Sequence, residues 1–294
     1  MRFATLARDG RAILAARRGD DYVDLCAAAP ALPPTLRGLI EAGEPALARA
    51  REALEGATGS TLIPLAQATY LPPILDAEKY LCLGLNYVDH AAESPYAKPS
   101  YPVLFPRYAT SLVGANAPLL RWPQSVEFDY EGELVAVIGK TARNVTRERA
   151  LDHVFGYSIC NDGSYRDYQF KTPQWTVGKN FDGSGPFGPE VVTADELPPG
   201  ATGLRLRTTL NGAVMQDAST DDMIFGVAET IAIITEVMTL VPGDVLVMGT
   251  PAGVGFARKP PVFMKDGDRV EVSIERIGVL ANPVRDAVTA PASR

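Results

Sequence analysis

The sequence predicts an α+β, β-rich fold, with a small N-terminal α/β domain at residues 1–74 and a larger domain at residues 75–294. With 294 residues, the chain is long enough for a main domain with a smaller appendage. Beyond residue 75, short apolar runs are separated by glycine and proline. Few helical patterns interrupt these runs, and no regular strand-helix-strand alternation is present, which favours a β-rich core.

The N-terminal region reads as a hairpin followed by a helix. Residues 2–7 and 11–16 are short apolar-rich runs, and the Asp-Gly pair between them is a strong turn signal. Alanine and leucine at helical spacing predict an amphipathic helix over residues 44–55. Two consecutive prolines at 72–73 end regular structure, so we place the domain boundary there.

The larger region is predicted to consist mainly of strands. These are expected at residues 79–84, 118–121, 131–139, 155–160, 190–193, 204–210, 244–248 and 269–274. Capping residues followed by an apolar stripe predict one long helix over residues 219–238, and a shorter helix is expected over 147–153. The small polar tail, residues 289–294, is expected to be disordered.

Composition argues against several classes of protein. The net charge of −7 comes without a basic stripe, so we expect no nucleic-acid partner. No apolar stretch is long enough to span a bilayer, and the start of the chain lacks the apolar centre of a signal peptide, so we expect a cytoplasmic protein without a membrane partner. Three widely spaced cysteines and two histidines argue against a disulfide framework or a zinc site.

Two glutamates at the head of an apolar run form the strongest local signal. In a strand, Glu131 and Glu133 would point to the same face, and such close like charges call for a cation. An all-oxygen site favours Mg²⁺, Mn²⁺ or Ca²⁺, and Asp162 is a third candidate ligand. The spacing alone fits the solvated face of an edge strand equally well.

Three other segments carry candidate catalytic or binding groups. On a helical turn, Glu93 would orient His90 as a general base, although a surface pair explains the same spacing better on sequence alone. Arg166 and Lys179 are suited to pair with a substrate carboxylate or a developing enolate, or are ordinary surface charges. Thr250 lies in a glycine-rich segment that either meets a ligand or only connects two elements.

Taken in order, these segments resemble the fumarylacetoacetate hydrolase superfamily, in its bacterial-type form with a short N-terminal domain. The resemblance covers about residues 75–285 and is specific because several ordered motifs contribute. The matching motifs are Gly84-Leu85-Asn86-Tyr87 with His90 and Glu93; Phe128-Asp129-Tyr130-Glu131-Gly132-Glu133-Leu134; Asn161-Asp162 with Arg166 and Gln169; Gln174-Trp175 with Gly178-Lys179; and Gly249-Thr250-Pro251.

The resemblance implies a mixed β-roll or β-sandwich catalytic domain, a homodimer, and Mg²⁺ or Mn²⁺ on Glu131, Glu133 and Asp162, with Ca²⁺ able to take the site in crystals. It implies that His90 and Glu93 form a water-activating dyad on a mobile lid that excludes bulk water on closing. Lys179 is expected to be catalytic. The expected substrate-binding residues are Arg107, Arg166, Gln169, Tyr165 and Thr250. Of these, Tyr165 departs from the family pattern, and Arg107 lies just beyond the loop at 94–106, which is expected to face the substrate.

The resulting functional prediction is a divalent-metal-dependent hydrolase. It would cleave a carbon-carbon bond in acylpyruvates or 1,3-dicarbonyl acids of the fumarylpyruvate or fumarylacetoacetate kind, in the catabolism of aromatic compounds or sugar acids. The alternative within the same fold is a decarboxylase, isomerase or hydratase of related 2-oxo acids, of the oxaloacetate or 2-hydroxyhepta-2,4-diene-1,7-dioate type. A metal-bound, β-rich binding protein without catalysis is the alternative from another class.

Overall fold

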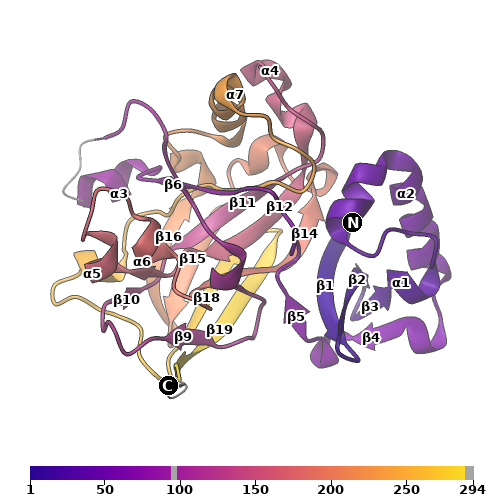
Figure 1. Cartoon of the computed structure of the whole chain (residues 1–294), viewed down its shortest axis with the longest axis horizontal. Helices are drawn as coiled ribbons and strands as arrows, with labels where there is room; N and C mark the ends of the chain where they lie inside the picture. The colour runs from indigo at the N-terminus through magenta and orange to yellow at the C-terminus, as the bar shows by residue number, and fades with distance from the viewer. Residues whose placement is uncertain (94–97, 289–294) are drawn as a thin grey trace, which may run out of the picture.

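The computed structural model describes residues 1–93 and 98–288, and within them a mixed sheet of twelve strands runs through the molecule (Figure 1). The order along this sheet is β4 (Leu62–Pro64), β3 (Asp21–Asp24), β2 (Arg11–Arg18), β1 (Arg2–Arg8), β14 (Gly185–Thr193), β12 (Val154–Asn161), β11 (Gly132–Ile138), β17 (Val245–Val247), β6 (Tyr80–Gly84) and β7 (Val103–Pro106). Strand β5 (Tyr70–Leu71) pairs with β1, and β8 (Leu112–Val113) pairs with β14. The predicted α+β, β-rich class is confirmed.

Two smaller sheets and seven helices complete the described fold. The first sheet has the order β16 (Ala213–Ser219), β15 (Arg205–Leu210), β18 (Arg269–Ile274), β19 (Gly278–Asp286) and β9 (Leu119–Arg121), and the second pairs β10 (Phe128–Asp129) with β13 (Ser164–Tyr165). The helices are α1 (Leu25–Ala28), α2 (Leu36–Gly56), α3 (Val88–Glu93), α4 (Arg147–Ala150), α5 (Arg166–Gln169), α6 (Thr176–Lys179) and α7 (Val227–Val237).

The N-terminal hairpin is confirmed, because β1 and β2 pair antiparallel up to the turn at Asp9. Strand β1 also pairs with β14, so the N-terminal strands, drawn in indigo in Figure 1, extend the sheet of the larger region. Helix α2 consists of two helical segments separated at Gly43, whose φ of 70° and ψ of −158° are not helical. The second segment confirms the predicted helix over residues 44–55, and the first segment, from Leu36, was not predicted. Thr35 defines its start by accepting a hydrogen bond from the Gly38 amide. The boundary at residue 74 stays a prediction.

Strand β11 lies at the centre of the large sheet and is buried along its whole length. Leu134, Ala136 and Ile138 pack in the core shared with β15, β18 and α7. Val135 and Val137 pack in the opposite core, which α2 and β1 cover. Because successive side chains of a strand alternate between faces, Glu133 shares the face of Val135 and Val137. This excludes the alternative of an exposed edge strand.

The long helix predicted over residues 219–238 begins much later than expected. Ser219 caps only a single 3₁₀ turn, in which its hydroxyl and the Asp222 carboxylate each accept a backbone hydrogen bond. The next residues do not continue the helix, because the amides of Ile224 and Phe225 donate to Asn86. Helix α7 starts only after Gly226. The helix expected over 147–153 is confirmed in its first half and continues as a 3₁₀ turn.

All eight strands predicted in the larger region are present, and β14 begins before its predicted start. The strands that were not predicted are β3, β4, β5, β7, β8, β10, β13, β16 and β19. Within residues 1–93 and 98–288, no helix is both long and apolar enough to cross a membrane. The predicted disordered tail at 289–294 and the start of the loop at 94–106 lie outside the described residues.

Candidate active site

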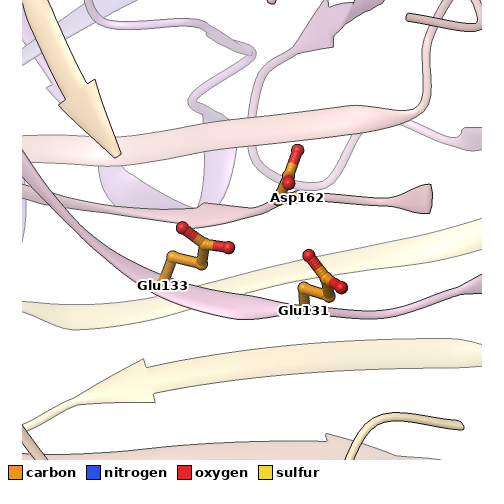
Figure 2. Close-up of side chains that lie close together, drawn as sticks. All are labelled: Glu131, Glu133 and Asp162. Atoms are coloured by element: carbon orange, nitrogen blue, oxygen red, sulfur yellow. The ribbon is translucent and has the colours of Figure 1, made fainter. Parts of the chain in front are cut away.

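Glu131, Glu133 and Asp162, which we call the acid triad, come together through the pairing of two central strands (Figure 2). Glu131 and Glu133 flank the first residue of β11, and Asp162 directly follows β12. The register places Gly132 opposite Asn161, and the Asp162 amide donates to the Glu131 carbonyl at 2.8 Å. One carboxylate oxygen from each residue lies within 4.8 Å of the others, and all three side chains are buried.

Buried cations surround two of these three acids. Lys179 Nζ lies 2.6 Å from both Glu131 Oε2 and Asp162 Oδ2. Arg166 Nη2 lies 2.6 Å from Glu131 Oε1 and 2.9 Å from Asp129 Oδ2. Arg107 forms an ion pair with the other oxygen of Asp162. The alternative of ordinary surface charge is therefore wrong for both Arg166 and Lys179, which are 2% exposed.

Glu133 differs from the other two acids because no arginine or lysine of the described chain lies within ion-pair distance of it. It accepts one hydrogen bond, at 2.6 Å, from the Gly249 amide. Burial raises the pKa of Glu133 well above its usual range, and the charges of Asp162 and Glu131 raise it further. Burial also favours a higher pKa for Glu131, but Arg166 and Lys179 outweigh it and hold that pKa below its usual range.

These observations fit a divalent cation. The donors are carboxylate oxygens, the ligands that hard cations such as Mg²⁺ and Mn²⁺ prefer. Four buried carboxylates meet three buried cationic side chains here, namely Asp129, Glu131, Glu133 and Asp162 with Arg107, Arg166 and Lys179. With all four carboxylates ionised, the site carries one excess negative charge. A divalent cation beside Glu133 would reverse this sign and favour an anionic substrate.

Helix α3, which we call the lid helix, places a histidine-carboxylate pair over this site. His90 Nδ1 lies 3.0 Å from Glu93 Oε1, and the His90 side chain is 8% exposed. The alternative of a surface pair is therefore wrong for His90. Both Glu93 oxygens accept from the Gly253 amide at 3.1 Å, which fastens the lid helix to the segment after β17.

That segment, residues 249–256, is the glycine-rich loop, and its backbone amides bind three different carboxylates. Gly249 donates to Glu133, Gly253 donates to Glu93, and Gly255 donates to Asp129 at 2.8 Å. Gly249 has φ of 88°, a conformation that glycine adopts without strain. The alternative of a plain connecting loop is excluded, because this backbone joins the lid helix to the acid triad.

A small cavity of about 30 Å³ lies between the lid helix and the acid triad. Thr250 lines it while its hydroxyl donates to the Gly132 carbonyl at 3.0 Å. Gln169 lines it and accepts from Arg166 Nη1 at 2.8 Å. The other lining residues are Leu83, Gly84, Leu85, His90, Phe105, Glu131, Glu133, Arg166, Phe170, Trp175, Lys179 and Phe256.

Arg107 and Tyr165 do not line this cavity, so we no longer assign them to substrate binding. Besides Asp162, the guanidinium of Arg107 binds the hydroxyls of Ser111 and Ser184, and it is buried beneath the acid triad. Tyr165 is buried between aromatic rings, and its hydroxyl donates to the Leu120 carbonyl at 2.7 Å. Arg107 therefore positions Asp162, and Tyr165 is a core residue.

Several residues at the site were not predicted from the sequence. Asp129 lies in a matched motif, yet its role depends on Arg166 and on the glycine-rich loop, which are distant in sequence. Phe105, Trp175 and Phe256 form apolar walls of the cavity, and isolated aromatic residues give no pattern that would mark them as such.

Comparison with known proteins assigns this arrangement to a family. Residues 79–285 match the model of the fumarylacetoacetate (FAA) hydrolase C-terminal domain. The chain is 42% identical over 269 residues to a mitochondrial oxaloacetate tautomerase from Xenopus laevis, covering 90% of this chain and 83% of that protein.

Two solved structures share the fold over 98% of this chain and their own full length. One is a fumarylacetoacetate hydrolase from Exiguobacterium antarcticum, with a TM-score of 0.83 and 37% identity. The other is a 2-hydroxyhepta-2,4-diene-1,7-dioate isomerase from Mycobacterium marinum, with a TM-score of 0.76 and 34% identity. The chain therefore belongs to the fumarylacetoacetate hydrolase superfamily.

Proposed function

We propose that this protein is a divalent-metal-dependent tautomerase that interconverts the keto and enol forms of short 2-oxo dicarboxylic acids of the oxaloacetate type. The tautomerase among its relatives supports isomerisation, the alternative reaction, better than the hydrolysis that we predicted first. The observation that carries the proposal is the His90–Glu93 pair fastened over a buried acid triad. Tautomerisation needs one base and one means of stabilising negative charge, without an attacking water.

The acid triad would hold the metal ion. Bound there, Mg²⁺ or Mn²⁺ would supply electrophilic stabilisation of the negative charge that develops on the 2-oxo oxygen of the substrate. Arg166 and Lys179 border the same cavity and are suited to bind the substrate carboxylates.

His90 would move the proton. Glu93 faces Nδ1, which leaves Nε2 of the imidazole for the substrate. Nε2 would take a proton from C3 of the keto form while the electron pair of that C–H bond forms the C2–C3 double bond and the π pair of the C2–O double bond moves onto the 2-oxo oxygen. Returning the proton to the 2-oxo oxygen completes the enol. Lys179 would balance the charge, and the lid helix would keep bulk water away.

The test is the rate of keto-enol interconversion of oxaloacetate, followed by the absorbance of the enol, with purified protein and Mg²⁺ or Mn²⁺. We expect the protein to accelerate the reaction well above the rate with metal and buffer alone. Metal binding without acceleration would instead favour a non-catalytic binding protein.

Hydrolysis of acylpyruvates is the second candidate, because the His90–Glu93 pair is also the arrangement that activates water. Release of pyruvate from an acylpyruvate would support it, and release of CO₂ from oxaloacetate would support decarboxylation. Whether the protein acts in the catabolism of aromatic compounds depends on which acylpyruvate, if any, it hydrolyses. Homodimer assembly and cytoplasmic location stay predictions, and the Xenopus relative is a mitochondrial protein by name.

A further inference from the structure

The cavity is too small for any 2-oxo dicarboxylic acid in the arrangement described. Its volume of about 30 Å³ accommodates only about one or two water molecules. A substrate can therefore enter only if some lining groups move. The length of substrate that fits depends on which lining groups move and on how far they move.

The charged groups of the acid triad and their partners, which we call the floor of the cavity, are held in place. Glu131 and Asp162 are buried and bound by Lys179, which is itself 2% exposed. Arg166 is fixed by Asp129, which also accepts from the Phe256 amide at 3.0 Å. These groups would lose buried ion pairs and hydrogen bonds if they moved, which is costly.

Aromatic rings back the two cations that the proposed function assigns to the substrate carboxylates. The Arg166 guanidinium lies 4.7 Å from the centre of the Phe256 ring, and Lys179 Nζ lies 5.1 Å from the centre of the Phe105 ring. Each cation thus has an apolar wall on one side. Phe256 in turn contacts Phe170, with ring centres 5.8 Å apart.

Trp175 forms the wall of the cavity next to β6. Its ring packs edge-on against Phe105, with ring centres 5.8 Å apart and an angle of 65° between the ring planes. A Cβ atom on Gly84 would lie 2.1 Å from the Trp175 ring, so the ring approaches this backbone as closely as only glycine allows. Trp175 and Phe256 are partly exposed, in contrast with the buried floor. Their rings can therefore be made smaller while the ion pairs of the acid triad with Arg166 and Lys179 remain.

We infer that Phe256 and Trp175 set the length limit of the site and select short 2-oxo dicarboxylic acids over extended ones. This inference rests on the proposed function and names its specificity-determining residues. A substrate with more methylenes would have to occupy the space of these rings, and each misfitting methylene lowers kcat/KM by about tenfold or more.

The test measures exchange of the C3 protons for deuterium by NMR, with oxaloacetate as the short substrate and 2-oxoadipate, with two further methylenes, as the long one. The variants are Phe256→Leu and Trp175→Leu. We expect the ratio of kcat/KM for the long substrate to that for the short substrate to rise about tenfold in each variant. Tyr108→Leu, at an exposed ring that does not line the cavity, is the matched control and should leave the ratio unchanged.

The possible outcomes distinguish the proposed function from the length limit set by the two rings. If the wild-type protein exchanges neither substrate, the proposed function fails. If it exchanges oxaloacetate and the variants keep the wild-type ratio, or lose both activities in proportion, the length limit is refuted while the proposed function stands. Thermal unfolding of each variant shows whether the ring substitutions leave the fold intact.

Discussion

The acid triad and the lid helix lie on opposite sides of one cavity, yet the fold holds them by different means. The triad stands on central strands whose backbones pair on both sides, and its side chains are buried. The lid helix has six residues, and its Glu93 accepts a hydrogen bond from the Gly253 amide. A short isolated helix has little stability of its own.

This difference suggests a division of labour. The charge-stabilising half of the site is built into the sheet, where reorganisation would cost the most. The half that moves protons rests on an element that can separate from the loop by breaking few bonds. Substitutions in the triad and in the lid helix should therefore have separable effects.

The largest effect should come from removing a charge of the acid triad. Glu131→Gln keeps the shape of the side chain but loses the charge that pairs with Lys179 and with a metal ion, so we expect kcat/KM to fall about a thousandfold or more. Metal affinity, measured by calorimetric titration with Mn²⁺, should fall with it. Glu52→Gln on the exposed face of α2 is the control. Full activity without metal binding would contradict the account.

Removing the base should separate the two halves of the site. His90→Ala should lower kcat by about a hundredfold to ten-thousandfold, because it removes the group that we assign as the base for the C3 proton. Mn²⁺ affinity should stay at the wild-type value, since His90 is not a ligand. His153→Ala, the other histidine of the chain, serves as the control. Equal loss of metal affinity in His90→Ala would show that the halves are not separable.

The anchor beneath the lid helix should affect stability more than chemistry. The buried Asn86 amide donates to the Phe225 and Met248 carbonyls and accepts from the Phe225 amide. Asn86→Ala leaves these groups unpaired, so we expect the free energy of unfolding in urea to fall by about 2–3 kcal/mol. Gln124→Ala, at an exposed turn, is the control. A change below about 0.5 kcal/mol would mean that these hydrogen bonds of Asn86 contribute little to stability.

The smallest effect should come from neutralising the orienting acid. Glu93→Gln retains an oxygen for the Gly253 amide but loses the charge beside His90. We expect kcat to fall about tenfold to thirtyfold, less than in His90→Ala, with unchanged Mn²⁺ affinity. A loss as large as that of His90→Ala would assign Glu93 a direct part in proton transfer.

The sequence predicted those parts of the site that depend on local geometry. Glu131 and Glu133 share a face because strand residues two apart always do, and His90 meets Glu93 because helix residues three apart are neighbours. Asp162 and Lys179 were weaker candidates on the sequence alone, and the family resemblance supported them. The position of Asp162 depends on the register of β11 and β12, and that of Lys179 depends on the placement of α6.

The predictions that were wrong concern residues whose positions depend on tertiary contacts. Nothing in the segment around Tyr165 shows that its ring enters the core and turns away from the cavity. Ser219 does cap a helical turn, but the turn ends after three residues because Asn86, distant in sequence, binds the chain that follows. Propensity and capping are local signals, and such contacts override them.

The most direct test of the central claim measures tautomerase activity and bound metal on the same sample. The protein is stripped of metal by a chelator, titrated with Mn²⁺, and assayed with oxaloacetate at each point. We predict that activity is lost on stripping and returns in proportion to one ion bound per chain, with Glu133→Gln restoring neither binding nor activity. Undiminished tautomerisation by the metal-free protein would contradict the account.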